Sequence, residues 1–117
     1  MKTKKRRPRN KFESRIEQLL KKLKARFGYE TEKLPYLISG HYLPDFVITT
    51  NHGKFYLETK GYFRPEAKRK LAAVKKLNPT VDIRLLFYSH NPQYIRWAEK
   101  NGFKWAVDTV PQEWLDE

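Results

Sequence analysis

The sequence contains no cysteine, which excludes disulfide bonds, thiolate zinc sites and thiol nucleophiles. It has no apolar run near the roughly 18 residues that a membrane-spanning helix requires, so we expect no membrane segment. Its basic beginning lacks the apolar stretch of a secretory signal, so we expect an intracellular protein. Acidic residues are few: the chain has 13 Asp and Glu against 25 Lys and Arg, which gives a net charge of +12. Such a charge opposes a compact state unless a polyanion neutralises it, so nucleic acid is the leading partner.

Length and charge distribution predict one folded domain behind a basic arm. The 117 residues are 39% hydrophobic and 15% aromatic, enough for one small core. Residues 1–11 contain seven basic residues and no acid, so we expect 1–11 to be a disordered arm and 12–117 to be a single folded domain. A solubilising tail and a nuclear-import look-alike are alternatives for the arm. Its residues expected to bind nucleic acid are Lys4, Lys5, Arg6, Arg7 and Arg9.

Hydrophobic spacing predicts alternating helices and strands. A stripe at helical spacing from Phe12 to Phe27 indicates a first helix, which Gly28 would end. The pattern further predicts a helix over 64–77, a short one from Asn91-Pro92 to Asn101-Gly102, and a helical turn over 111–115. Strands are predicted over 29–38, 42–49, 54–60, 81–88 and 103–107. This order indicates an α/β domain with a central mixed β-sheet.

The strands 42–49 and 54–60 should form a hairpin whose register can be derived. A four-residue turn at 50–53 pairs Thr49 with Lys54 and Phe46 with Leu57. This register puts four apolar residues, Phe46, Ile48, Phe55 and Leu57, on one face, whereas a slip of one residue would destroy that arrangement.

The opposite face of this hairpin carries the candidate chemistry. Asp45 is expected directly across from Glu58, with Cβ atoms roughly 5 Å apart, and Lys60 points to the same side. Two adjacent carboxylates repel each other unless a cation lies between them, and a hard divalent ion with oxygen ligands meets that need. Such an ion would activate a phosphate or a water, and Lys60 would orient or deprotonate that water or stabilise charge on the phosphate. The alternative is a cross-strand salt-bridge cluster of the same three residues without metal.

The segments around these residues resemble known nucleases. Leu43-Pro44-Asp45-Phe46 and then Leu57-Glu58-Thr59-Lys60-Gly61 resemble the PD…(D/E)xK signature of the restriction-endonuclease-like superfamily. Over residues 12–116 the sequence also resembles the phage endonuclease I family of Holliday-junction resolvases, with the shared segments in the same order. Besides the two segments above, these are Phe12-x-Ser14-x-x-Glu17, Leu34-Pro35-Tyr36, Asn78-Pro79-x-x-Asp82-Ile83-Arg84, Glu99-Lys100-x-Gly102-x-Lys104 and Pro111-x-Glu113-Trp114.

This resemblance implies a fold and an activity. The fold would be a restriction-endonuclease-like core, a mixed sheet flanked by helices. The activity would be metal-dependent, structure-selective hydrolysis of phosphodiester bonds that resolves Holliday junctions and other branched DNA. Family members are intertwined homodimers, and residues 36–43 are the candidate connecting segment, although this stretch is shorter here than in the family. The protein would act in the cytoplasm of a bacterial or phage-infected host.

The resemblance also implies roles for individual residues. Asp45 matches the aspartate that bridges the metals, Glu58 the second carboxylate and Lys60 the motif lysine, and the carbonyl of Thr59 would face the metal. The implied cofactor is Mg²⁺, with up to two ions per active site and Mn²⁺ able to substitute.

A helix glutamate should support the second metal position, and two residues compete for it. On a helical wheel Glu13 lies about 70° and Glu17 about 110° from the apolar stripe, which does not separate them. The Phe-x-Ser-x-x-Glu match favours Glu17 as a catalytic and metal-binding residue, and leaves Glu13 on a solvated face.

The second predicted helix carries further basic residues. Lys68, Arg69 and Lys70 are expected on its outer side, where they would grip a DNA arm. An enzymatic alternative for the whole chain is a nickase or repair nuclease of the same superfamily acting on duplex or mismatched DNA. A non-catalytic nucleic-acid-binding protein, with only a salt bridge on its hairpin, is the alternative from another class.

Overall fold

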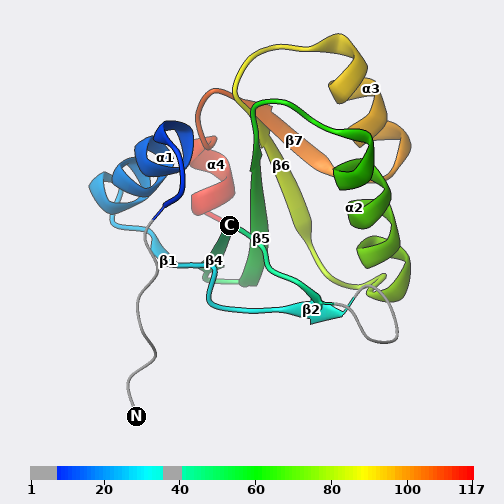
Figure 1. The fold of residues 1–117 in the computed structure, drawn as a ribbon. Helices are drawn as coiled ribbons and strands as arrows, with labels where there is room; N and C mark the ends of the chain where they lie inside the picture. Colours follow the sequence, from blue (N-terminus) through cyan, green and yellow to red (C-terminus); the bar gives the residue numbers. More distant parts are fainter. Residues whose placement is uncertain (1–7, 36–40) are drawn as a thin grey trace.

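A five-stranded mixed sheet forms the centre of the computed structural model, which describes residues 8–35 and 41–117. The strands lie in the order β1–β4–β5–β6–β7 (Figure 1). Their bounds are β1 Arg26–Tyr29, β4 Phe46–Thr50, β5 Gly53–Lys60, β6 Ile83–Phe87 and β7 Lys104–Val107. The first three strands pair antiparallel and the last three parallel. The predicted α/β fold with a mixed sheet flanked by helices is therefore confirmed.

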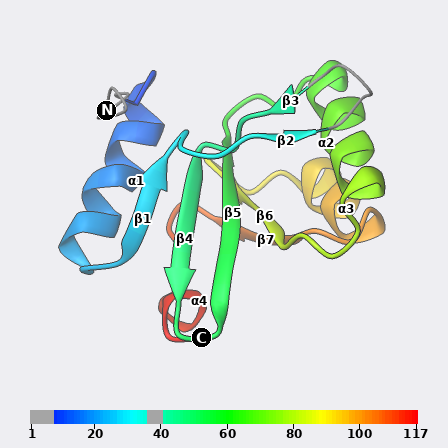
Figure 2. The same cartoon turned by 90° about the horizontal axis from the view of Figure 1, so that it is seen from below.

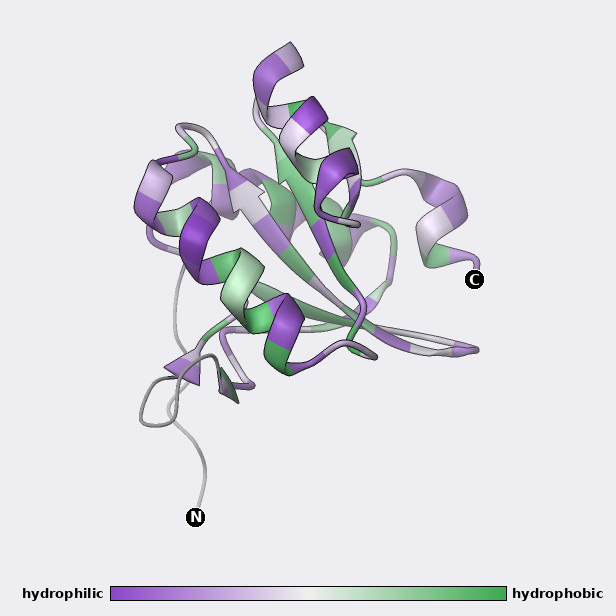
Figure 3. Cartoon of the chain, turned by 90° about the vertical axis from the view of Figure 1, so that its right-hand side faces the viewer, coloured by the Kyte–Doolittle hydropathy of each residue, from purple (hydrophilic) through white to green (hydrophobic). Residues whose placement is uncertain are grey.

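Helices cover both faces of the sheet, as Figures 1 and 2 show. On one face lie α1 (Lys11–Lys22) and α4 (Gln112–Leu115), and on the other lie α2 (Pro65–Leu77) and α3 (Pro92–Lys100). Each pair of helices closes a separate hydrophobic cluster against the strands. In Figure 3 the hydrophobic colour runs along the strands between these layers. Among the described residues, no helix combines the length and the apolar character that crossing a membrane requires.

The β4–β5 hairpin has the predicted register. Thr49 pairs with Lys54, and Phe46 pairs with Leu57. The turn closes at Gly53, whose φ of 134° is a conformation that residues with a Cβ rarely adopt. The side chains of Phe46 and Leu57 are fully buried under α1, which is the face that the alternation predicted.

The first helix ends earlier than the sequence pattern predicts. It stops at Lys22 because Lys24 takes a left-handed conformation, with φ of 56°. Two hydrogen bonds close this end, from Ala25 N–H to the Leu20 carbonyl at 3.0 Å and from Lys24 N–H to the Lys21 carbonyl at 3.1 Å. This is the Schellman arrangement, and it offsets the roughly 1–2 kcal/mol that the left-handed conformation costs a residue other than glycine. Residues 26–29, expected to end the helix and begin the next strand, form the edge strand β1.

The predicted strands 29–38 and 42–49 are both interrupted. Two short strands, β2 (Leu34–Pro35) and β3 (His41–Tyr42), pair as a separate two-stranded sheet. This small sheet lies beside α2 in Figure 2, and the Asn78 side chain at the end of α2 donates to the Pro35 carbonyl at 2.8 Å. Residues 36–40, which include most of the expected dimer-connecting segment, lie outside the described residues.

The folded domain begins before residue 12. The Asn10 side chain caps α1 by accepting from the Glu13 backbone N–H at 2.8 Å, and Lys11 is the first helical residue. The Arg9 backbone N–H donates to the Tyr29 hydroxyl at 3.3 Å. Residues 9–11 therefore belong to the domain rather than to the predicted arm. Lys4, Lys5, Arg6 and Arg7 lie outside the described residues.

Candidate active site

A cavity of about 390 Å³ lies at the end of the β4–β5 hairpin away from its turn. Its walls come from the start of the domain, from β3, from the ends of β4 and β5, and from α2. Its charged lining residues are Glu30, Asp45, Glu58, Arg9, Lys60 and Lys70. The cavity therefore collects the hairpin residues that the sequence singled out, together with three charged residues from other elements.

Asp45 lies one residue before β4 and is held by Thr59 of β5. Its Oδ2 accepts from the Thr59 backbone N–H at 2.9 Å and from the Thr59 hydroxyl at 2.8 Å. Burial, reinforced by the negative charges of Glu58 and Glu13, raises the pKa of Asp45 to about 8. Without a cation, the site therefore holds a proton on Asp45 over much of the neutral range.

Glu58 is buried and forms an ion pair with Lys60. The Glu58 Oε2 lies 2.9 Å from the Lys60 Nζ, and Oε1 accepts from the hydroxyl of the buried Tyr42. Burial opposes a charge on Lys60, but the carboxylates of Glu58 and Asp45 outweigh it and raise the pKa of Lys60 above its ordinary value. In the metal-free protein Lys60 is thus an ammonium group at neutral pH, paired with Glu58 and influenced by the charge of Asp45.

The structure brings Glu13, not Glu17, to the Asp45 carboxylate. Glu13 is buried, and one carboxylate oxygen each of Glu13, Glu30 and Asp45 lie within 4.8 Å of one another. The Glu13 side chain accepts from the Tyr29 hydroxyl and from Asn10 Nδ2. Glu17 lies one turn further, about 6 Å along the helix axis, and pairs with a lysine of its own helix.

Glu30 is the site residue that sequence reasoning missed. Its backbone N–H donates to the Asp45 carbonyl at 2.8 Å, directly beyond the pairing of Tyr29 with Phe46. Its buried carboxylate pairs with Arg9 at 3.0 Å. A correct assignment of β1 would have found it, because continuing the β1–β4 register by one residue sets Glu30 opposite Asp45.

The basic residues predicted to bind DNA are placed differently from one another. On α2, the Lys68 ammonium lies 5.5 Å from the ring centroid of Phe63 and 5.3 Å from that of Tyr94, so it covers part of the core. Arg69 is exposed, and Lys70 lines the cavity with Asp45 and Glu58.

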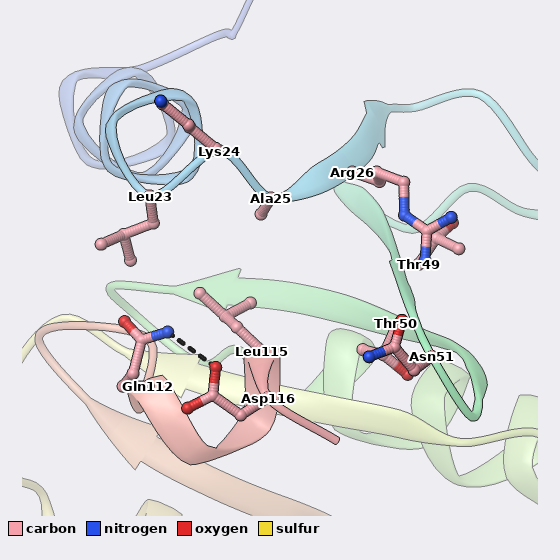
Figure 4. Close-up of a pocket in the computed structure, with 10 residues that line it drawn as sticks. All are labelled: Leu23, Lys24, Ala25, Arg26, Thr49, Thr50, Asn51, Gln112, Leu115 and Asp116. Atoms are coloured by element: carbon pink, nitrogen blue, oxygen red, sulfur yellow. Dashed lines mark hydrogen bonds between the residues drawn. The ribbon is translucent and has the colours of Figure 1, made fainter.

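A second cavity, of about 170 Å³, lies at the opposite end of the hairpin (Figure 4). Its lining comes from the end of α1, the start of β1, the β4–β5 turn and α4. The one carboxylate of that lining, Asp116, accepts from Gln112 Nε2 at 3.0 Å. Lys24 lines this cavity, but the paired carboxylates that mark the first cavity are missing from its lining.

The donor set of the first cavity fits a hard divalent cation. Its ligand atoms are all oxygens, which Mg²⁺ and similar ions prefer. Oxygens bound to one such ion, each at about 2.1 Å, lie at most about 4.2 Å apart. The carboxylate oxygens of Glu13, Glu30 and Asp45 lie within 4.8 Å of one another, so small side-chain shifts would bring them to one ion.

Comparison with known proteins gives concordant matches. The family model described as phage endonuclease I matches residues 1–117. The chain is 32% identical over 120 residues to "Endonuclease I" of Escherichia phage T7, which covers 93% of this chain and 78% of that protein. It is 31% identical over 114 residues to "Endodeoxyribonuclease 1" of Enterobacteria phage T3, which covers 88% of this chain and 73% of that protein.

Proposed function

Because this chain belongs to the phage endonuclease I family, we propose that it is a structure-selective DNA endonuclease that cuts Holliday junctions and other branched DNA by hydrolysing phosphodiester bonds. The observation that carries this proposal is the gathering of Asp45, Glu58 and Lys60 in one cavity of a chain with net charge +12. A cavity with paired carboxylates in a basic protein suits a reaction at a phosphodiester, because the protein's positive charge attracts the DNA backbone to the site.

The carboxylates gathered in and beside the cavity support a metal cofactor. Arg9 pairs with Glu30 and Lys60 pairs with Glu58, while Glu13 and Asp45 form no ion pair among the described residues. We propose Mg²⁺, with Mn²⁺ able to substitute and up to two ions per site. The ligands would be the carboxylates of Asp45 and Glu58, the carbonyl of Thr59 and a helix glutamate. We add the Glu30 carboxylate, which has an oxygen within 4.8 Å of one of Asp45. When bound, the ion supplies Lewis-acid stabilisation of the phosphate's negative charge.

Glu13 is the helix glutamate that we propose for this role, in place of Glu17. Its burial and its hydrogen bonds from Tyr29 and Asn10 fix its carboxylate beside Asp45. Glu17 is half-buried and pairs with Lys21 at 3.6 Å. The glutamate selected by the Phe-x-Ser-x-x-Glu match lies one turn further along the helix, so the position of Glu13 supports our choice.

Lys60 acts as a cation in the proposed mechanism. In the metal-free protein its raised pKa keeps it protonated, so it is suited to stabilise negative charge on the reacting phosphate. Asp45, whose pKa is also raised, must instead lose its proton before it can bind a cation.

A junction requires two cuts on opposing strands, and each chain has one such cavity. We therefore propose a two-fold symmetric homodimer, which would present two sites. The DNA arms would contact Arg69 and Lys70 of α2, together with Arg9 and the basic residues at 4–7. Light scattering that shows a monomer at micromolar concentration, with and without junction DNA, would rule out this assembly.

A non-catalytic nucleic-acid-binding protein is a weaker interpretation. It requires Asp45, Glu58 and Lys60 to form a self-sufficient salt-bridge cluster. The Lys60–Glu58 pair is part of such a cluster, but Asp45 is bonded to Thr59 instead. The structure thus supplies one half of the expected cluster.

The proposed function is tested by incubating the protein with a synthetic four-way junction and a linear duplex of matched sequence, each with and without Mg²⁺. We expect cleavage of the junction in Mg²⁺ and little cleavage of the duplex. Equal cleavage of both substrates would instead indicate the nickase or repair-nuclease alternative. Binding without any cleavage would indicate the non-catalytic one.

A further inference from the structure

We propose that Arg9 is a positioning residue. Its guanidinium forms an ion pair with Glu30 in the metal-free protein and competes with the divalent cation for that carboxylate. This inference rests on the proposed function, because it takes the carboxylate cluster as a cation site. Its consequence is that Arg9 leaves Glu30 when a cation binds.

The first support is the position of Arg9 at the cavity. Its guanidinium Nη2 lies 3.0 Å from the Glu30 Oε1, and both residues line the hollow that contains Asp45. The Glu30 carboxylate is one of the three that approach within 4.8 Å of one another. The guanidinium therefore lies against the same group of oxygens that a divalent ion would use.

The second support is that the backbone of Arg9 is tied to the same cluster. Its N–H donates to the Tyr29 hydroxyl at 3.3 Å, and this hydroxyl donates to Glu13. Arg9 is thus held beside two of the three carboxylates. Its side chain pairs with Glu30, and its backbone N–H bonds the Tyr29 hydroxyl that contacts Glu13. The contact with Glu30 therefore joins two residues of the folded domain.

The third support is the difference in exposure between the two partners. The Arg9 side chain is 64% exposed, whereas that of Glu30 is 3% exposed. A buried carboxylate needs a countercharge, and Glu30 raises the pKa of Arg9, as an ion pair does. When a cation supplies that countercharge, the guanidinium is repelled by a like charge, and it can turn into solvent without opening the core.

This exchange would connect the cofactor to the substrate. Arg9 ends a run of basic residues that are expected to contact DNA, and a released guanidinium becomes available to a phosphate at the cavity's edge. Arg9 would then bind the carboxylate cluster in the metal-free protein and the DNA backbone in the metal-bound one.

The test measures the affinity of the full-length protein for Mn²⁺ in the absence of DNA, from the electron spin resonance signal of free Mn²⁺. We expect Arg9→Gln to bind Mn²⁺ about three- to tenfold more tightly than the parent, because a competing charge is gone. Arg15→Gln is the matched control. It removes the same charge from an exposed arginine on α1 that pairs with Asp108, and should stay within about twofold of the parent.

An unchanged or weaker Mn²⁺ affinity in folded Arg9→Gln would overturn the proposal, and so would an equal gain in Arg15→Gln. A second measurement needs no variant. The rotation of the Arg9 guanidinium, followed by nuclear magnetic resonance of the parent, should be restricted without Mg²⁺ and become free at saturating Mg²⁺. Rotation that stays restricted in Mg²⁺ would also overturn it.

The two levels of proposal fail differently. If the parent cleaves junctions in Mg²⁺ but the Arg9→Gln affinity is unchanged, the competition is wrong and the nuclease function stands. If the parent neither binds Mn²⁺ nor cleaves, the metal-dependent function is wrong and the competition falls with it.

Discussion

Asp45 accepts two hydrogen bonds from Thr59, one from the backbone N–H at 2.9 Å and one from the hydroxyl at 2.8 Å. These two hydrogen bonds connect Asp45, the residue before β4, to Thr59 near the end of β5, between Glu58 and Lys60. It also partly offsets the burial that raises the pKa of Asp45, because both bonds favour the charged carboxylate. Thr59, an uncharged residue, therefore lowers the pKa of Asp45 through its hydrogen bonds.

We predict that Thr59→Val shifts the pH profile of cleavage to higher pH. The valine keeps the shape and the backbone N–H but removes the hydroxyl bond, so the pKa of Asp45 rises further. Single-turnover cleavage rates measured across pH should show the shift. Thr49→Val, at an exposed position of β4, is the matched control and should leave the profile in place. A Thr59→Val profile that overlies the parent's would contradict this role.

The metal-free protein should lose stability as the pH rises. The folded pKa of Asp45, about 8, lies above its unfolded value near 3.9, so the folded state binds more protons between these values. The stabilising contribution is complete below about pH 4 and is lost as the pH rises through 8. Urea unfolding with a chelator present should therefore show greater stability at pH 5.5 than at pH 8.

Asp45→Asn tests the origin of this slope. The amide cannot titrate, so the variant should show a flatter dependence between pH 5.5 and 8 than the parent. A parent protein more stable at pH 8, or an unchanged slope in the variant, would show that another group controls the dependence.

The choice between the two helix glutamates gives a paired prediction. Glu13→Gln should lower junction cleavage by roughly two orders of magnitude or more, the scale expected when a group that stabilises transition-state charge is lost. Glu17→Gln removes the same charge one turn away and should change the rate by only a few-fold. Single-turnover rates at saturating Mg²⁺ separate them, and the reverse ranking would restore Glu17 to the site.

A buried arginine on β6 stabilises the end of the chain. Arg84 is 2% exposed, pairs with Asp82 at 2.8 Å and with Glu117 at 2.7 Å, and its guanidinium carbon lies 4.0 Å from the ring centroid of Phe55. Arg84→Met should lower the free energy of unfolding by about 2 kcal/mol, less than for a fully buried pair because both acidic partners are partly exposed. Urea unfolding tests this value. A change below about 0.5 kcal/mol would mean that the pairs contribute little.

The hairpin was predictable because two independent patterns agree on it. A four-residue turn and the alternation of apolar residues select one register, and that register brings Asp45 and Glu58 to one end. The helix 65–77 was predictable for a similar reason, since Pro65 begins it and Asn78 follows its last residue.

The edge strand and the helix glutamate were not predictable from the same rules. Phe27 satisfies the helical stripe and also pairs with Ile48 in β1, and the residue that ends the helix is a lysine in a conformation typical of glycine. The wrong helix end hid Glu30. The wheel left Glu13 and Glu17 equivalent, because the choice depends on Tyr29, a contact across the fold.

The most direct test of the account is the single-turnover cleavage of a four-way junction by Asp45→Asn and by the parent, at saturating Mg²⁺. The account predicts that the variant is slower by roughly two to three orders of magnitude, because the amide is a poor ligand for a hard cation and brings no charge to it. It also predicts that the variant binds the junction at least as tightly as the parent without metal, since a negative charge facing the phosphates is gone. Cleavage by Asp45→Asn at a rate near that of the parent would contradict the proposed active site.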